Sequence, residues 1–291
     1  MDSFAVIPKK SLHIRSNSLP SKPHPIVAQV DEHLCRLKSS EATSSTSSLG
    51  SRLGSLQDLQ GCIDKLLLLP FTQQTLVNES DNKWVDDLLE GSLRLLDLCD
   101  IAKDALLQTK ECARELESVL RRRRGETVSA SDLKKCLSSR NMIKKTIHKA
   151  LKGIKRKCSQ KSEESSATVG LLKEVEAITY STVESVLSFI AGSKLPSKLS
   201  RWSLVSKVVQ PKRVACNSED TYANEVEMVD ATLNSIASHT TDKSNFLMQV
   251  ENVQDSLRKF ESSIQDLEED IESLYRHLIK NRVSLLNILN H

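Results

Sequence analysis

Helix-breaking residues are scarce in this sequence of 291 residues. Proline is absent from 71–195 and again from 212–291, and the whole chain contains eight glycines. Both residues destabilise the interior of a helix, so long stretches without them that are rich in Leu, Lys, Glu and Arg favour helices. No segment shows the sustained alternation of β-branched residues that is typical of a strand. The sequence therefore predicts an all-α protein, built as an elongated multi-helix bundle.

Residues that could carry catalysis or bind metal are not arranged in a recognisable pattern. The seven cysteines stand singly, with no C-x-x-C pair, and the seven histidines never pair at the spacing of metal ligands. Glycine-rich phosphate loops, the G-x-S-x-G nucleophile motif and the H-E-x-x-H zinc motif are also absent. We therefore expect a protein that is not an enzyme, with no catalytic residues, cofactor or metal. We expect its thiols to be small core residues in a reducing compartment.

Long apolar runs are missing as well. The longest aliphatic run is the LLLL of 66–69, far short of the roughly 20 residues that a membrane-spanning helix needs. No positively charged start followed by an apolar run opens the chain. These features predict a soluble intracellular protein without a signal peptide or a transmembrane segment. The cytoplasm is the expected location and the nucleus is the alternative.

Prolines, serines and glycines divide the chain into segments. Residues 1–25 hold four of the seven prolines and are predicted to form a disordered Ser/Pro-rich tail. Residues 26–51 are predicted to contain a short helix to Lys38 and a serine-rich linker, and 52–291 to form the helical bundle domain. Within the bundle we expect helices over about 52–69, 82–123, 167–190 and from a cap at Ser129 or Ser131 to Lys157. The irregular segment 194–213 carries Trp202 and several aliphatic residues, so we expect it to pack on the bundle.

A heptad repeat marks the last helix of the chain. Its apolar residues follow an unbroken spacing of four and three: Phe246, Val250, Val253, Leu257, Phe260, Ile264, Leu267, Ile271, Leu274 and Leu278. Asn281 interrupts this heptad seam, and Leu285 and Ile288 resume it. The seam is typical either of a long helix that closes a bundle within the chain or of a coiled coil that self-associates. The flanking positions lack the alternating Glu and Lys by which a parallel zipper selects its partner, which favours the bundle.

Positive charge is concentrated between residues 121 and 161. This stretch holds 15 Lys or Arg against two acidic residues, a net of +13, whereas the whole chain has a net charge of +3. Such a cluster is a candidate face for an anionic partner. Its members are Arg121, Arg122, Arg123, Arg124, Lys144, Lys145, Lys152, Lys155, Arg156 and Lys157.

Three interpretations of this basic stretch stay open. The basic helix 134–161 could contact an anionic membrane surface, or the clusters could serve nuclear import or nucleic-acid binding. The third interpretation is a solvated face of an amphipathic bundle helix, because an apolar stripe runs through the same segment: Leu133, Leu137, Ile143, Ile147, Ala150 and Ile154. The ten aromatic residues are scattered singly, and neither a zinc-finger nor a basic-zipper layout is present, which disfavours nucleic acid.

The N-terminal tail contains the motif RSNSLP. Arg15 precedes Ser18 by three residues, a context that basophilic kinases use, and a phosphate on Ser18 would add nearly two negative charges. Together with Ser16 and Pro20, the motif matches phosphopeptides that the arginine clusters of 14-3-3 proteins bind. The tail is therefore predicted either to dock a 14-3-3 protein or to be a disordered or packed lead-in to the bundle.

Several longer segments resemble one plant-specific family. They are HIRSNSLPSKPHP (13–25), LLLLPFTQQTL (66–76), KWVDDLLEGSLRLLDLCD (83–100), RRRRG (121–125), RWSLVSKV (201–208) and YRHLIKNRVSLLNILNH (275–291). In this order they resemble the domain-of-unknown-function family 241, which is grouped with BYPASS-like proteins. The resemblance implies a helical protein without established catalytic residues and an association with root and shoot development. It transfers no ligand-binding residue to this chain.

These observations predict a non-enzymatic, plant-specific regulatory or scaffold protein. We expect it to act in root and shoot development through contacts with protein partners, among them a 14-3-3 protein at the tail, and through self-association if the last helix forms a coiled coil. The alternative is a peripheral protein that associates with an anionic membrane or a nucleic acid through the basic helix 134–161.

Overall fold

The computed structural model describes residues 24–40, 45–78, 84–122, 130–155, 166–192, 225–238 and 243–290. All regular secondary structure within these ranges is helical, which confirms the all-α prediction. The predicted disordered tail up to residue 23 and the segment 194–213 lie outside the described residues.

The helices follow one another as α1 (Pro25–Ser39), α2 (Thr46–Leu67), α3 (Pro70–Asn78), α4 (Trp84–Arg122), α5 (Ala130–Lys155), α6 (Ala167–Ala191), α8 (Glu225–Ser238) and α9 (Lys243–Leu289). The predicted helices are all found, and α3 and α8 are additional. α2 begins within the stretch that was predicted to be a serine-rich linker, because the side chain of Ser45 accepts a hydrogen bond from the backbone N–H of Ser48 and caps the helix.

Pro70 separates two helices. α2 ends at Leu67, close to the expected limit of 69, and Pro70 is the first residue of α3. Proline suits this position because its fixed φ angle matches the first helical turn and no N–H is needed there. α3 was missed in the sequence because it is short and only Thr72 and Leu76 are buried in it.

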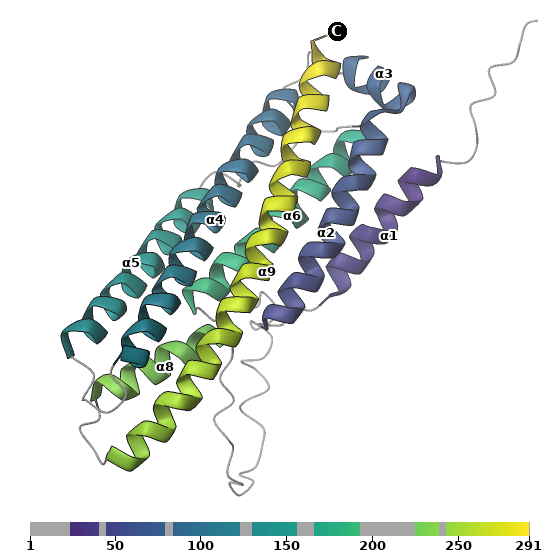
Figure 1. The fold of residues 1–291 in the computed structure, drawn as a ribbon. Coiled ribbons are helices and arrows are strands. Elements are labelled where there is room, and N and C mark those ends of the chain that lie inside the picture. Colours follow the sequence, from purple (N-terminus) through teal and green to yellow (C-terminus); the bar gives the residue numbers. More distant parts are fainter. Residues whose placement is uncertain are drawn as a thin grey trace, which may run out of the picture.

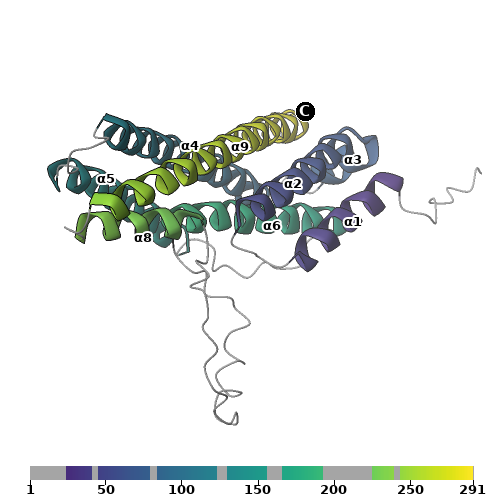
Figure 2. The same cartoon turned by 60° about the horizontal axis from the view of Figure 1, so that its bottom comes forward.

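The bundle is elongated and has two layers (Figures 1 and 2). α4, α9 and α2 lie side by side in one layer, and α5, α6 and α1 lie in the other. α8 crosses the lower end of the bundle beside α9, and α3 packs at the opposite end, near the C-terminus. The apolar residues Ile26, Val30, Leu34 and Leu37 of α1 are buried, as their spacing predicts. They belong to the same core as the later helices; the predicted limits of the domains stay a prediction.

The heptad seam of α9 is buried within the chain. Leu257, Phe260, Ile264, Leu267, Ile271, Leu274 and Leu278 all lie in the core, and Val253 is half-buried. The neighbours that cover α9 are chiefly α2 and α4. The side chains of Phe246 and Val250 are outside the described residues. The seam therefore closes a bundle within the chain, and the helices α2 and α4 occupy the positions that a second copy would take in a coiled coil.

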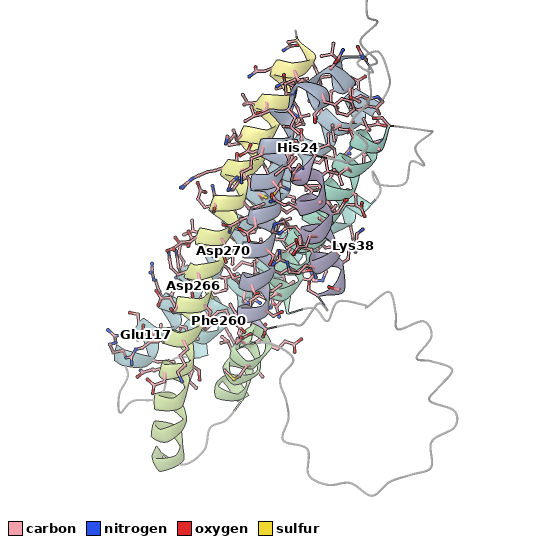
Figure 3. All side chains as sticks on the ribbon, turned by 90° about the vertical axis from the view of Figure 1, so that its right-hand side faces the viewer. His24, Lys38, Glu117, Phe260, Asp266 and Asp270 are labelled. Atoms are coloured by element: carbon pink, nitrogen blue, oxygen red, sulfur yellow. The ribbon has the colours of Figure 1, made fainter. Side chains whose placement is uncertain are left out.

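Charged side chains tie α9 to α4 and α2 along both edges of the seam. Lys110 pairs with Glu268, and Lys103 pairs with Glu272 at 2.5 Å between Nζ and Oε2. On the other edge Nε2 of Gln57 donates to Oδ1 of Asp270 at 3.2 Å. Figure 3 shows Asp266 and Asp270 on successive turns of α9. Several acidic residues of α9 thus belong to contacts between helices.

Candidate functional site on helix α5

Helix α5 is amphipathic, and its apolar side faces the bundle. Cys136, Ile143 and Ile147 are buried, and α5 packs against α4, α6 and α8. Leu137 and Leu151 are half-buried beside them. The apolar stripe predicted for this helix is confirmed for its described members, whereas the side chains of Leu133 and Ile154 are outside the described residues.

The opposite side of α5 is exposed and basic. Met142, Lys145, Lys149 and Lys152 are all exposed, and steps of three and four residues place them on one side of a helix. They span about 15 Å at 1.5 Å per residue. An open hollow along this side is lined by Asn141, Lys144, Lys145, His148, Lys149 and Lys152. We call Asn141, Met142, Lys145, His148, Lys149 and Lys152 the lysine face; it contains no acidic residue.

Ion pairs hold the lysines at the margins of this face but not those in its centre. Lys135 pairs with Glu115 of α4 at 2.7 Å between Nζ and Oε1. Lys144 pairs with Asp230 of α8 at 2.6 Å between Nζ and Oδ2. Within the part of the chain that the structure describes, Lys145, Lys149 and Lys152 have no ion-pair partner. Their ammonium groups are therefore free to meet an external anion.

A buried charge cluster sets the orientation of α5. Arg140 is 5% exposed; its Nε donates to Oδ1 of Asp230 at 3.1 Å, and its Nη2 donates to the carbonyl of Ile190. The C-terminal end of a helix attracts positive charge, which suits Arg140 and Lys144 beside the last turn of α6. α6 ends there at Gly192, whose φ of 66° favours glycine. The cluster joins α5, α6 and α8 and leaves the lysine face turned outward.

His148 completes the face from within the helix. Its Nδ1 donates to the carbonyl of Lys144 at 2.7 Å, so in the neutral imidazole the proton is on Nδ1 and Nε2 is an acceptor. The ring lies among lysines of the hollow. This arrangement adds a polar group to the face without adding negative charge.

The structure brings together some of the predicted basic residues and not others. Lys145 and Lys152 share the lysine face, and Lys144 lies at its margin. Arg121 is at the end of α4, where it pairs with Glu117 at 2.7 Å. The side chains of Arg122 and Lys155, and all of Arg123, Arg124, Arg156 and Lys157, lie outside the described residues, as do Arg15, Ser16, Ser18 and Pro20 of the tail motif. The predicted face thus stays a prediction beyond α5.

Sequence reasoning missed Lys149 and His148 as members of the face. Both could have been found from the helical period: Lys149 follows Lys145 by four residues and precedes Lys152 by three, and His148 follows Lys145 by three and precedes Lys152 by four. Met142 was missed because a lone methionine carries no signal in the sequence. Its 61% exposed surface is visible only in the fold.

Burial makes Cys99 and Cys112 poor nucleophiles. Burial raises the pKa of Cys99 to about 12, and the hydrogen bond with Cys136, together with burial, raises the pKa of Cys112. A thiol reacts as its thiolate, so a raised pKa suppresses reactivity. Cys62 and Cys136 are buried as well, whereas Cys35 is exposed, which corrects the prediction of a core position for this one residue.

In the described residues, no His, Cys, Asp and Glu side chains form a group that could hold a metal ion. None of the helices in these residues is both long and apolar enough to cross a membrane.

Comparison with known proteins identifies the family. The family model described as Protein BPS1 matches residues 52–288, which include α3 to α8, most of α2 and nearly all of α9. No curated protein and no solved structure matches the chain.

Proposed function

The chain belongs to the BPS1 family, as its resemblance to BYPASS-like proteins predicts, and we propose that it is a non-enzymatic regulatory scaffold that acts in root and shoot development. Membership by itself suggests a plant regulatory protein. The more specific proposal is that the helical bundle presents surfaces to protein partners.

An exposed apolar corner carries this proposal. Leu68 and Phe71, at the junction of α2 and α3, are 67% and 68% exposed, and Val77 at the end of α3 is 40% exposed. They occur at the end of the bundle where α9 terminates (Figure 1). Exposed apolar groups that gather in one place are typical of contact sites, and aromatic residues contribute strongly to such contacts. We propose that the corner contacts a protein partner through an apolar segment of that partner.

The test replaces two exposed apolar residues of this corner by serine. Leu68→Ser with Phe71→Ser should leave the helix content unchanged, because both side chains are exposed, but should fail to restore root and shoot growth in plants that lack the protein. Leu93→Ser with Leu107→Ser is a matched control, since these side chains of α4 are 47% and 42% exposed. The proposal is wrong if the corner variant restores growth as well as the wild type does.

Docking of a 14-3-3 protein at the tail remains part of the proposal. Its support is the RSNSLP motif with Ser18 three residues after Arg15. Wild type and Ser18→Ala, purified in parallel from seedlings, should differ in phosphate at Ser18 and in a bound 14-3-3 protein. If both proteins carry the same partners and Ser18 is unmodified in the wild type, the tail does not dock a 14-3-3 protein through Ser18.

A second candidate function is peripheral association with an anionic membrane or nucleic acid through the basic helix 134–161. The observation that favours it is the set of α5 lysines that have no ion-pair partner among the described residues, since lysines of a merely solvated bundle helix are often balanced by acidic neighbours. Binding to either anion should be sensitive to salt.

A further inference from the structure

The lysine face combines free charge with an exposed apolar side chain. Lys145, Lys149 and Lys152 are exposed and have no ion-pair partner among the described residues, and no acidic residue interrupts them. Met142 is on the same side of α5 and is 61% exposed. A face that only needs to be solvated gains nothing from an exposed methionine, whereas helices that lie on membranes combine basic residues with apolar ones.

The position of α5 suits contact with an extended surface. α5 is at the edge of the bundle, on the side away from α1 and α2, and among the described helices α4, α6 and α8 pack against it (Figures 1 and 2). The lysine face runs along the helix for about 15 Å. A long, open side of an outer helix can meet a flat surface with several residues at once.

The composition of the face favours lipid over nucleic acid. Proteins that recognise bases or single-stranded nucleic acid use the paired hydrogen bonds of arginine and stacking on aromatic side chains. The lysine face contains neither arginine nor an aromatic ring other than His148. Lysine ammonium groups act as point charges toward phosphates, and Met142 has no role in a contact with a sugar–phosphate backbone.

We propose that the lysine face of α5 docks on the anionic surface of a membrane. Lys145, Lys149 and Lys152 contact lipid phosphates and carboxylates, and Met142 enters the headgroup region beside them. This inference rests on the second candidate function and limits it to one partner, a bilayer that contains anionic lipid. The buried Arg140–Asp230 pair orients the face and does not touch the lipid.

Vesicle binding tests this inference with the full chain. Sedimentation with vesicles of phosphatidylcholine and phosphatidylserine, at about 0.1 M salt where the screening length is about 10 Å, should show binding that is absent with phosphatidylcholine alone. Each lysine near an anionic surface contributes roughly a fivefold gain in affinity. Lys145→Gln, Lys149→Gln and Lys152→Gln together should therefore weaken binding on the order of 100-fold.

Two controls separate the face from net charge and from folding. Lys65→Gln, Lys173→Gln and Lys259→Gln remove the same charge from α2, α6 and α9 and should leave most of the binding intact. Met142→Ser should weaken binding roughly fivefold through lost apolar burial, whereas Leu107→Ser on α4 should not. Helix content measured by circular dichroism should be equal in all variants.

The outcomes distinguish this inference from the function on which it rests. We call the variant with Lys145, Lys149 and Lys152 replaced the face variant, and the one with Lys65, Lys173 and Lys259 replaced the scattered variant. Loss of vesicle binding in the face variant alone supports membrane docking. Equal loss in the scattered variant overturns it, because net charge then explains the binding. Binding to duplex DNA but not to vesicles, lost in the face variant, also overturns it while the second candidate function stands. If neither vesicles nor DNA bind, both are wrong.

Discussion

Asn281 of α9 donates from Nδ2 to Oε1 of Gln60 in α2 at 2.7 Å. Both side chains are buried, and Nε2 of Gln60 in turn donates to Oγ1 of Thr179 in α6 at 2.9 Å. Asn281 is the residue that breaks the heptad seam in the sequence. The break is therefore a polar contact that joins three helices across the core, and such a contact penalises any other register of α9.

Asn281→Leu should destabilise the bundle by about 1–3 kcal/mol, because Oε1 of Gln60 is left buried without a donor. The double variant Gln60→Leu with Asn281→Leu should recover most of this loss, since neither polar group is then stranded. Urea denaturation followed by circular dichroism measures both. A double variant that is less stable than Asn281→Leu would contradict this account.

Leu267→Lys with Leu274→Lys should abolish folding, because both side chains are buried, at 1% and 0% exposure, and an unpaired buried charge is costly. Ile279→Lys with Val283→Lys is the control on the same helix, where the side chains are 40% and 49% exposed. The control should keep its helix content and its thermal transition. A seam variant that is instead a folded, soluble monomer, obtained from a dimeric wild type, would favour the coiled coil.

Arg140→Ala should cost about 3 kcal/mol of unfolding free energy, because it leaves the mostly buried Asp230 carboxylate with one cation fewer. Lys135→Ala breaks an exposed pair with Glu115 and should cost less than about 1 kcal/mol. In Arg140→Ala the backbone amides of α8 should exchange hydrogen faster than in the wild type. Unchanged protection of α8 would mean that this pair does not hold the helix in place.

Glu176→Gln should raise the melting temperature at pH 7 but not at about pH 4. The carboxyl group of Glu176 fills the space over Gly91 of α4, and burial raises its pKa above 4.5, against the smaller opposing effect of Arg94. The folded state therefore binds this proton more tightly than the unfolded state, so the penalty of ionising Glu176 appears as pH rises above 4.5. The glutamine side chain has the same shape and avoids this penalty.

The measurement is a thermal melt of both proteins over this pH range. Glu90→Gln is a control on α4, because Glu90 forms an exposed pair with Arg94 at 3.0 Å. Glu176→Gln would contradict the prediction if it lowered the melting temperature at pH 7 as strongly as at pH 4.

Long periodic segments were predictable and short ones were not. The heptad seam located α9, and the spacing of Ile26, Val30, Leu34 and Leu37 located α1, because burial on one side of a helix imposes the period of the helix on the sequence. α3 and α8 span nine and 14 residues. Isolated helices of this length are marginal, so their stability comes from packing on the rest of the bundle.

The candidate site shows the same division. The sequence located the basic stretch and the polar side of α5, since charge and period are local properties. It did not reveal that Lys144 is paired with Asp230 while Lys145 and Lys149 have no ion-pair partner among the described residues. That difference depends on α8, which packs against α5 although the two helices are far apart in the sequence.

By itself the sequence determined the helical class, the apolar side of each long helix and the location of positive charge, because these properties follow from residue types at a period of 3.6. The tertiary structure decided which partner covers each side. It buried the heptad seam between α2 and α4, brought Asn281 into contact with Gln60, and left the lysine face uncovered by the described helices. These outcomes depend on contacts between residues far apart in the chain, whose free energies no local pattern specifies.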